Sequence, residues 1–210
     1  MSIYRGKNGY DSARLWNARS QQALQERGEL YVYDTRLDSN DQIFLWLQSE
    51  FAKLPSKPDM LEIGAGFGRW AEAFQDTYNS FTGVDIVEAR VQHAKELHAH
   101  LQRATFQLIG PAWDLGRTFD VVLSITVIQH LLMPEAVDIL RSIERHLAPG
   151  GVAYLAEWRI PDVSLLEAEA LYRKETTPSH MIPKPLGLLR DAVPSLQWTG
   201  SEGRFILRRR

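Results

Sequence analysis

Cysteine is absent from the sequence. Its absence excludes disulfide bonds, metal sites built on thiolates and enzymes that use a cysteine nucleophile. Long apolar runs are missing as well. A membrane-spanning helix needs about 18 consecutive apolar residues, and no stretch of the sequence is that long. The first residues also lack the apolar core of a signal peptide. We therefore expect a cytoplasmic protein with no part in the membrane.

An excess of charge of one sign is missing too. The 24 lysines and arginines are nearly balanced by 26 aspartates and glutamates, which leaves a net charge of −2. Nucleic acids attract proteins through a surplus of positive charge, and here only a short terminal cluster, Arg208–Arg210, is strongly basic. We interpret that cluster as a solvated tail and do not expect a nucleic acid as the partner. The sequence gives no indication of the oligomeric state.

Apolar residues follow two alternating periodicities along the chain. Short continuous apolar runs, typical of strands buried on both faces, are separated by segments with the apolar spacing of helices. This pattern predicts an α/β fold with a Rossmann-like, doubly wound sheet of about seven strands. We expect the sheet to be mostly parallel with an antiparallel C-terminal strand, and helices to cover both faces. The predicted strands are 60–63, 81–87, 104–110, 119–126, 152–158, 196–200 and 204–209.

Three local signals set the ends and faces of the predicted helices. Ser39 and Gln42 form a capping box at the start of the second helix. Leu97 counts among the inward-facing residues of helix 88–101. The turn Pro149-Gly150-Gly151 ends helix 132–147. The predicted helices are 11–27, 39–54, 70–78, 88–101, 132–147, 161–175 and 186–193.

The stretch MLEIGAGFGRW, residues 60–70, places three glycines between a predicted strand and a predicted helix. A dinucleotide loop has the spacing G-x-G-x-x-G, but Gly68 comes one residue too early for it. Glu62 would repel a phosphate, whereas it would attract an ammonium or sulfonium group. Asp85, at the end of the next strand, is placed to accept hydrogen bonds from ribose hydroxyls. A ribose and a cationic amino-acid tail, without phosphate, describe S-adenosylmethionine.

Four motifs follow one another in register. They are E-x-G-x-G-x-G at 62–68, GVD at 83–85, FDVVLSITVIQHL at 119–131 and LAPGG at 147–151. In this order and spacing they resemble the motifs of class I S-adenosylmethionine-dependent methyltransferases, over about residues 40–158. The resemblance implies S-adenosylmethionine as the cofactor and S-adenosylhomocysteine as its product. It also implies in-line methyl transfer to oxygen or nitrogen of a small-molecule acceptor.

The resemblance further implies a single methyltransferase domain over residues 1–210. Residues 1–38 would form an N-terminal helical lid, and residues 39–158 the cofactor-binding core. Residues 159–210 would supply substrate-side helices and a closing pair of strands.

The same resemblance assigns residues to the cofactor. Glu62 and the Gly64 backbone would hold the methionine amine, and Asp85 the ribose. Trp113 could pack on adenine, because the acid that often binds the adenine amine is displaced here to Asp114; a partly exposed core aromatic is the alternative. The expected cofactor contacts are Glu62, Gly64, Ala65, Gly66, Gly68, Asp85, Ile86, Ala112, Trp113, Ser124, Ile125, Tyr33 and Arg36.

Three residues are candidates on the acceptor side. His130, with an ordinary pKa of about 6.5, could act as the base that a hydroxyl acceptor needs. A structural histidine is the alternative. Gln129 could orient the acceptor, and Arg159 could bind a carboxylate or phosphate on it.

No metal site is expected. His93, His98 and His100 fall on one predicted helix, but no two of them are four residues apart, so we interpret them as solvated surface. Three other functions stay open. They are a nucleic-acid (RNA) methyltransferase, a protein that binds the cofactor without catalysis, and a nicotinamide-dependent oxidoreductase.

Overall fold

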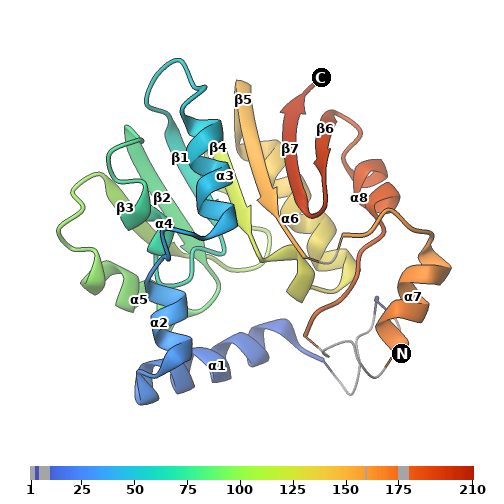
Figure 1. Ribbon diagram of the computed structural model, residues 1–210, viewed down its shortest axis with the longest axis horizontal. Helices are drawn as coiled ribbons and strands as arrows, with labels where there is room; N and C mark the ends of the chain where they lie inside the picture. Colours follow the sequence, from blue (N-terminus) through green and yellow to red (C-terminus); the bar gives the residue numbers. More distant parts are fainter. Residues whose placement is uncertain (1–2, 5–9, 159, 175–179) are drawn as a thin grey trace. The chain divides into compact units, whose positions relative to one another are not determined.

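The computed structural model describes residues 3–4, 10–158, 160–174 and 180–210. Its seven strands follow the order β3-β2-β1-β4-β5-β7-β6 (Figure 1). The chain divides into two compact units. The N-unit is Ala13–Trp113, and the C-unit is Met1–Ser12 together with Asp114–Arg210. The predicted arrangement of one domain in three segments stays a prediction.

Three parallel strands form the sheet of the N-unit, with β2 between β1 and β3. Ile63 pairs with Val84 and Asp85 pairs with Leu108, so the strands end at a common edge. Nearly every residue of β1 and β2 is buried, as their continuous apolar runs predict. The strands are β1 (Asp59–Ile63), β2 (Ser80–Asp85) and β3 (Ala104–Leu108).

Five helices belong to the N-unit. α4 follows β1, and α5 follows β2 and packs against β2 and β3. α2 was not expected from the sequence, because it buries none of its residues and therefore lacks an apolar stripe. The helices are α1 (Ser12–Glu26), which begins at the last residue of the C-unit segment, α2 (Glu29–Thr35), α3 (Gln42–Phe51), α4 (Arg69–Ala73) and α5 (Glu88–Leu97).

Two expected helix ends in the N-unit are wrong. The cap of α3 is Asp41 and not Ser39, because the Asp41 carboxylate accepts hydrogen bonds from the amides of Ile43 and Phe44 at 2.7 and 3.1 Å. A carboxylate binds helix amides more strongly than a hydroxyl and also opposes the helix dipole. α5 ends at Leu97, which is 38 % exposed and does not face inward.

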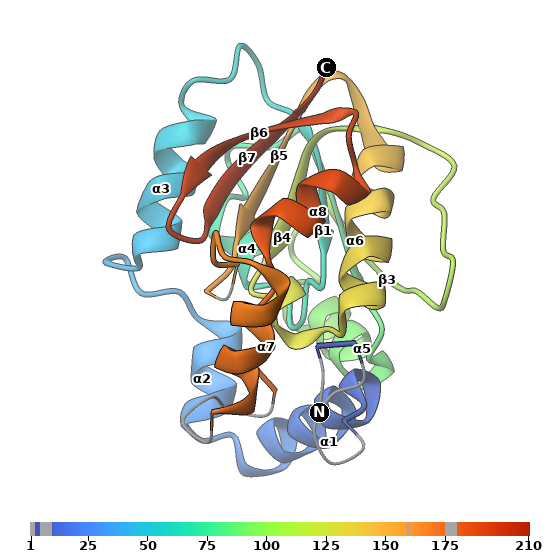
Figure 2. The ribbon, with the colours of Figure 1, turned by 90° about the vertical axis from the view of Figure 1, so that its right-hand side faces the viewer.

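The C-unit carries the other four strands. β4 and β5 are parallel, β7 runs antiparallel to β5, and β6 runs antiparallel to β7. Figure 2 shows α8 beside α6, and α6 also contacts β4 and β5. The strands are β4 (Phe119–Ile125), β5 (Leu147–Ala156), β6 (Leu196–Ser201) and β7 (Arg204–Arg209). The helices are the short 3-10 helix η1 (Ile128–His130), α6 (Met133–His146), α7 (Leu165–Arg173) and α8 (Leu186–Ala192).

The α/β prediction is confirmed, with β7 as the antiparallel strand near the C-terminus. One expected boundary is corrected. The segment Pro149-Gly150-Gly151 lies inside β5 and does not end α6, which stops at His146. The reason is that Leu147 already pairs with Phe119, and the register then shifts before Val152 pairs with Val121. An irregularity of this kind lets extra residues fit within a strand.

Candidate functional site

The loop from β1 to α4 has an uncommon backbone conformation. Gly64, Gly66 and Gly68 have φ angles of 74°, 56° and 82°, in the left-handed region that residues with a side chain seldom adopt. The Gly64 amide donates a hydrogen bond to the Val84 carbonyl at 2.8 Å, which ties the loop to β2. A Cβ on Gly68 would lie 2.7 Å from the Phe106 ring. Packing therefore also requires glycine at position 68.

Glu62 lies near the end of β1 and is 2 % exposed. Its Oε2 atom is buried and has no hydrogen-bond partner among the described residues. Burial raises the pKa of Glu62 well above its ordinary value, and the nearby Asp85 adds to the rise, whereas Arg69 opposes it. A buried acceptor without a donor is costly. This buried oxygen suits a cationic donor that the described residues do not provide.

Asp85 ends β2 with both carboxylate oxygens engaged by the backbone. Oδ2 accepts from the Gly66 amide and Oδ1 from the Val87 amide, each at 2.9 Å. The Ile86 amide also acts on this carboxylate, and an ionised carboxylate has about four acceptor positions, so Asp85 retains capacity for a further donor. Burial raises the pKa of Asp85, and the charge of Arg90 and these amides oppose the rise. The carboxylate is thus fixed in orientation and able to accept from a ligand.

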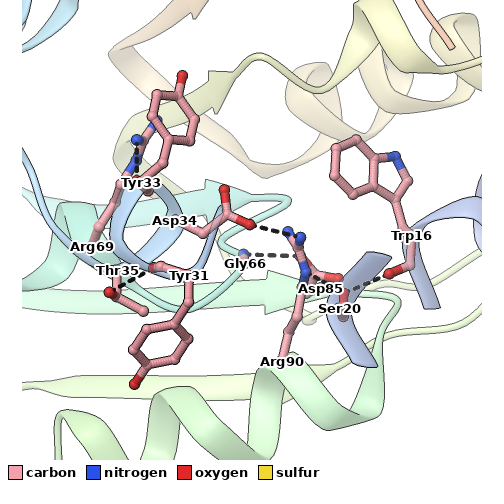
Figure 3. A network of polar contacts seen from close by, with 10 residues as sticks. All are labelled: Trp16, Ser20, Tyr31, Tyr33, Asp34, Thr35, Gly66, Arg69, Asp85 and Arg90. Carbon is pink, nitrogen blue, oxygen red and sulfur yellow. Dashed lines mark hydrogen bonds and ion pairs between the residues drawn. The ribbon is translucent and has the colours of Figure 1, made fainter. Parts of the chain in front are cut away.

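Side chains of α1, α2, α4 and α5 surround this loop (Figure 3). Arg90 donates hydrogen bonds to Ser20 Oγ at 2.6 Å and to Asp34 Oδ2 at 3.1 Å. Arg69 donates to the Tyr33 carbonyl at 3.0 Å and lies 5.0 Å from the Tyr33 ring centroid. Residues of α2 therefore contact both helices that follow the strand ends carrying Glu62 and Asp85.

Among the other expected cofactor contacts of the N-unit, Ala65 is buried in the glycine loop, and the rest lie near the surface. Ile86, directly after Asp85, is 43 % exposed, and Tyr33 is 58 % exposed. Trp113 is half-buried, and Ala112 before it has a φ of 55°, which is uncommon for a residue with a side chain. Arg36 is exposed at the end of α2.

In the C-unit, β4 ends with two buried residues of the expected set, Ser124 and Ile125. The Ser124 Oγ atom is buried and has no hydrogen-bond partner among the described residues. Thr126 follows with a φ of 57°, and its amide donates to the Ala156 carbonyl at 2.7 Å. The chain therefore turns sharply after β4 while it stays attached to β5.

Glu157, directly after β5, fixes the turn that leads into η1. Its carboxylate accepts hydrogen bonds from the amides of Val127, Ile128 and Gln129 at 3.0, 2.9 and 3.0 Å. Glu157 is 2 % exposed, and burial raises its pKa to about 7, although these amides and Lys184 oppose the rise. Three donors account for the place of this carboxylate in the interior.

Gln129 and His130 form a chain of hydrogen bonds that fixes the protonation state of His130. The Trp158 amide donates to Gln129 Oε1 at 2.7 Å, so the Gln129 amide nitrogen faces His130 Nε2, at 3.1 Å. That nitrogen can only donate, and His130 Nε2 must accept. His130 Nδ1 lies 2.7 Å from the His180 carbonyl oxygen and carries the proton. This arrangement assigns a neutral imidazole with its lone pair on Nε2.

Lys184 is completely buried in the segment before α8. Its Nζ donates to the Ile182 carbonyl at 2.6 Å. Burial lowers the pKa of Lys184 to about 7, against the opposing charges of Glu157 and Glu135. The C-unit therefore holds a buried acid and a buried base, and the charge of each partly opposes the effect of burial on the pKa of the other.

Comparisons with known proteins bear on the family and on the fold. Residues 61–153 match the family model for a methyltransferase domain. A dTDP-4-amino-2,3,4,6-tetradeoxy-D-glucose N,N-dimethyltransferase of Saccharopolyspora spinosa is 30 % identical over 118 residues, which cover 52 % of this chain and 44 % of that protein. Residues 61–153 therefore match a methyltransferase domain, and the comparisons support the predicted resemblance to class I S-adenosylmethionine-dependent methyltransferases. The chain spans less than half the length of the curated relatives that it matches.

Solved structures share the fold of this methyltransferase domain. CalS10, an amino pentose methyltransferase from Micromonospora echinaspora, has a TM-score of 0.64 at 17 % identity, over 90 % of this chain and 96 % of its own. A methyltransferase from Anabaena variabilis has a TM-score of 0.69 at 10 % identity, over 100 % and 99 %. The [4+2]-cyclase SpnF has a TM-score of 0.58 at 18 % identity, over 74 % and 58 %. At these identities the likeness concerns the fold alone.

The structure brings the expected site residues together in two groups. Glu62, the glycines and Asp85 meet in the N-unit, and Gln129 and His130 meet in the C-unit with Glu157 and His180. Arg159 lies outside the described residues. The sequence does not predict a role for Asp34, Arg69 and Arg90. These residues belong to three separate helices, and only the folded structure brings them near the site.

The three histidines near α5 differ from one another. His98 is 5 % exposed and contacts the Phe67 carbonyl oxygen through Nε2 at 2.9 Å, so its interpretation as solvated surface is wrong. His93 Nε2 lies 2.8 Å from the Tyr31 hydroxyl, and His100 Nε2 lies 2.9 Å from Glu72 Oε2. Over the described ranges, no group of three or more histidine, aspartate or glutamate side chains is arranged to hold a metal ion. Within the same ranges, no helix has the length and apolar character needed to cross a membrane.

Proposed function

We propose that this protein transfers the methyl group of S-adenosylmethionine to oxygen or nitrogen of a small-molecule acceptor. One observation carries the proposal. The buried Oε2 of Glu62 has no hydrogen-bond donor among the described residues, in a unit that also holds a loop of three left-handed glycines and a carboxylate, Asp85, that retains acceptor capacity. A ligand with an ammonium group and a ribose diol satisfies these groups at the same time.

The residues of the N-unit would hold the cofactor in named roles. Glu62 would accept from the ammonium group, because a charged donor compensates a buried carboxylate best. Asp85 would accept from the ribose hydroxyls, and the exposed Ile86 would pack on adenine. The glycine backbone leaves room for a ligand to approach the main chain. When bound, S-adenosylmethionine supplies a methyl group already activated on sulfur.

The acceptor side is proposed on the C-unit. The neutral His130 presents a lone pair on Nε2, so it could remove a proton from a hydroxyl acceptor once Gln129 releases that nitrogen. A nitrogen acceptor that binds unprotonated would need no such base. Ser124 and Ile125 would face the methionine end of the cofactor, and Gln129 and Arg159 would orient the acceptor. These assignments stay predictions.

Two related methyltransferases support a sugar-like acceptor. One is described as acting on an amino sugar nucleotide and the other on an amino pentose. The net charge of −2 also disfavours a nucleic-acid acceptor. We therefore propose amino sugars as the first acceptor class to examine, with phenolic hydroxyl compounds as the second.

A second candidate is cofactor binding without methyl transfer. The observation in its favour is that a protein described as a [4+2]-cyclase shares this fold. The same Glu62 and Asp85 groups would serve either function, so binding alone does not separate the two.

A transfer screen separates these candidates. The purified protein is incubated with S-adenosylmethionine labelled in the methyl group and with pools of amino sugars, phenols and transfer RNA. We expect label in a small-molecule pool, and much less label with a Glu62→Gln variant when the cofactor is not saturating. Label only in the RNA pool would contradict the small-molecule proposal. Binding of the cofactor with no labelled product in any pool would favour the second candidate.

A further inference from the structure

Arg90 lies in the first turn of α5, close to the cofactor loop, and is only 9 % exposed. The other buried residues of α5 are the apolar Val91 and Ala94. A buried guanidinium is unfavourable unless hydrogen bonds and opposite charge compensate it. The contacts of Arg90 therefore indicate why a charge occupies this position.

The first set of contacts reaches α1. Arg90 Nε donates to Ser20 Oγ at 2.6 Å, and the guanidinium carbon lies 4.9 Å from the centroid of the Trp16 ring. It also lies 5.1 Å from the centroid of Phe67, a residue of the glycine loop. Both ring distances fall within the range of cation–π attraction. One guanidinium thus contacts both α1 and the loop.

The second contact reaches α2. Arg90 Nη2 and Asp34 Oδ2 form an ion pair at 3.1 Å, in which the side chains are 11 % and 16 % exposed (Figure 3). A pair so largely shielded from water is screened less by salt than a surface pair. α2 buries none of its own residues, so this ion pair and the contacts of Tyr31 and Tyr33 are its main links to the unit.

The third relation is to Asp85. Arg90 Nη1 lies 3.2 Å from the position that a Cβ on Gly66 would occupy, so the guanidinium lies against the loop residue whose amide binds Asp85. The positive charge of Arg90 also lowers the pKa of Asp85, against the effect of burial. Arg90 therefore favours the ionised carboxylate that accepts hydrogen bonds.

We propose that Arg90 is a positioning residue that joins α1 and α2 to the ribose-binding carboxylate, so that occupation of the site stiffens both helices. The proposal rests on the proposed function, because it takes Asp85 as the ribose acceptor. Because Arg90 contacts α1, α2 and the loop at the same time, a ligand that restricts the motion of the loop also restricts the motion of both helices. By reciprocity, loosening α1 and α2 weakens cofactor binding to the same extent.

The experiment combines ligand affinity with hydrogen exchange. S-adenosylhomocysteine is titrated into the wild type and into Arg90→Met, Arg90→Lys, Asp34→Asn and Arg103→Met variants. Arg103 is an exposed arginine of the same unit and serves as the matched control. Amide exchange of residues 13–35 is then measured for each protein with and without saturating ligand.

We expect the wild type to gain protection over residues 13–35 on binding. Arg90→Met should bind about 10-fold more weakly, and Asp34→Asn about 3-fold more weakly. Both should lose the gain in protection even at saturation. Arg90→Lys keeps the charge near Asp85, but its single amine cannot replace the separate guanidinium nitrogens that bind Ser20 and Asp34. This variant should therefore bind the ligand more tightly than Arg90→Met without restoring the protection. Arg103→Met should match the wild type.

Different outcomes overturn different claims. Absence of ligand binding by the wild type would contradict the proposed function. Wild-type binding that Arg90→Met retains in full, with the same protection of α1 and α2, would overturn the role of Arg90 alone. If Arg90→Met does not fold, Asp34→Asn decides, because it removes the ion pair and leaves the arginine in place.

Discussion

Glu62 and Glu157 are two carboxylates in similar positions with opposite surroundings. Each lies at the carboxyl end of a parallel strand, β1 or β5, and each is 2 % exposed. Glu157 accepts three backbone hydrogen bonds and lies near a buried lysine. Glu62 has a buried oxygen with no partner among the described residues.

The difference separates a structural carboxylate from a binding carboxylate. Three backbone amides donate hydrogen bonds to the Glu157 carboxylate, so this buried residue stabilises the turn into η1. Within the described part of the chain, Glu62 Oε2 lacks a hydrogen-bond partner, and folded proteins retain such a group mainly where a ligand supplies one. The same contrast separates Gln129 and His130, which are engaged with each other, from the buried hydroxyl of Ser124.

Exchange of each carboxylate for its amide should give the largest contrast. Glu157→Gln places an NH2 group among three N–H donors, so we expect unfolding free energy to fall by about 3 kcal/mol. Glu62→Gln alters a buried carboxyl group whose Oε2 has no partner among the described residues, so the unfolding free energy should change by no more than about 0.5 kcal/mol. Chemical denaturation of both variants without ligand measures this. Equal losses would contradict the distinction between the two sites.

The buried Lys184 should give the C-unit a pH dependence that Glu62 does not share. Its pKa is about 7 in the folded chain, below the 10.5 of an ordinary lysine. Between these values the unfolded chain binds the extra proton, so stability rises with pH. We therefore expect the unfolding free energy of the wild type, minus that of Lys184→Met, to increase by up to about 1.4 kcal/mol per pH unit above pH 7.

Denaturation at pH 7, 8 and 9 tests this rise. Lys57→Met, at an exposed lysine in the loop before β1, is the control and should follow the wild type at every pH. A constant difference between wild type and Lys184→Met would show that Lys184 is not held uncharged. Glu157 acts in the opposite sense below pH 7, because its raised pKa makes the folded chain bind the extra proton and stability fall as pH rises toward 7.

The charge of Glu62 should matter for binding. Glu62→Gln should weaken S-adenosylhomocysteine binding by about 30-fold, the value of a charge-assisted hydrogen bond to a buried group. Burial raises the pKa of Glu62 and a bound ammonium group would lower it, so ligand binding should be accompanied by release of protons. Calorimetry in two buffers of different ionisation enthalpy measures both quantities. Undiminished affinity in the variant would remove Glu62 from the site.

The smallest effect is expected at Ser124. Its buried hydroxyl has no partner among the described residues, so Ser124→Ala should leave unfolding free energy unchanged or raise it by about 0.5 kcal/mol. Ser20→Ala is the matched comparison. The Ser20 hydroxyl accepts a hydrogen bond from Arg90, so this variant should lose about 1 kcal/mol of unfolding free energy. Thermal unfolding of both variants gives the order. A larger loss at Ser124 would indicate a hydrogen bond inside the chain.

The sequence predicts much of the fold and of the cofactor side. Continuous apolar runs set the parallel strands, and Glu62, the glycines and Asp85 stand close together in the sequence around two strand ends. The N-terminal contacts were harder to predict, because α2 has no apolar stripe and is held instead by Arg69, Arg90 and His93 from other helices.

The C-unit shows why side-chain partners escape sequence analysis. Gln129 and His130 were chosen as chemistry-bearing residues, but only the fold shows that the Trp158 amide and the His180 carbonyl engage them. Lys184 lies in a segment with the composition of a loop, and its complete burial follows from tertiary packing. Their roles in methyl transfer stay predictions.

The most direct test of the central claim is a titration of the wild type with S-adenosylhomocysteine and, separately, with NAD. The claim is that the Glu62–Asp85 site takes a ligand with a ribose and a cationic amino-acid tail and without a phosphate. We predict saturable binding of S-adenosylhomocysteine and none of NAD at the same concentrations. Binding of NAD alone would contradict the account.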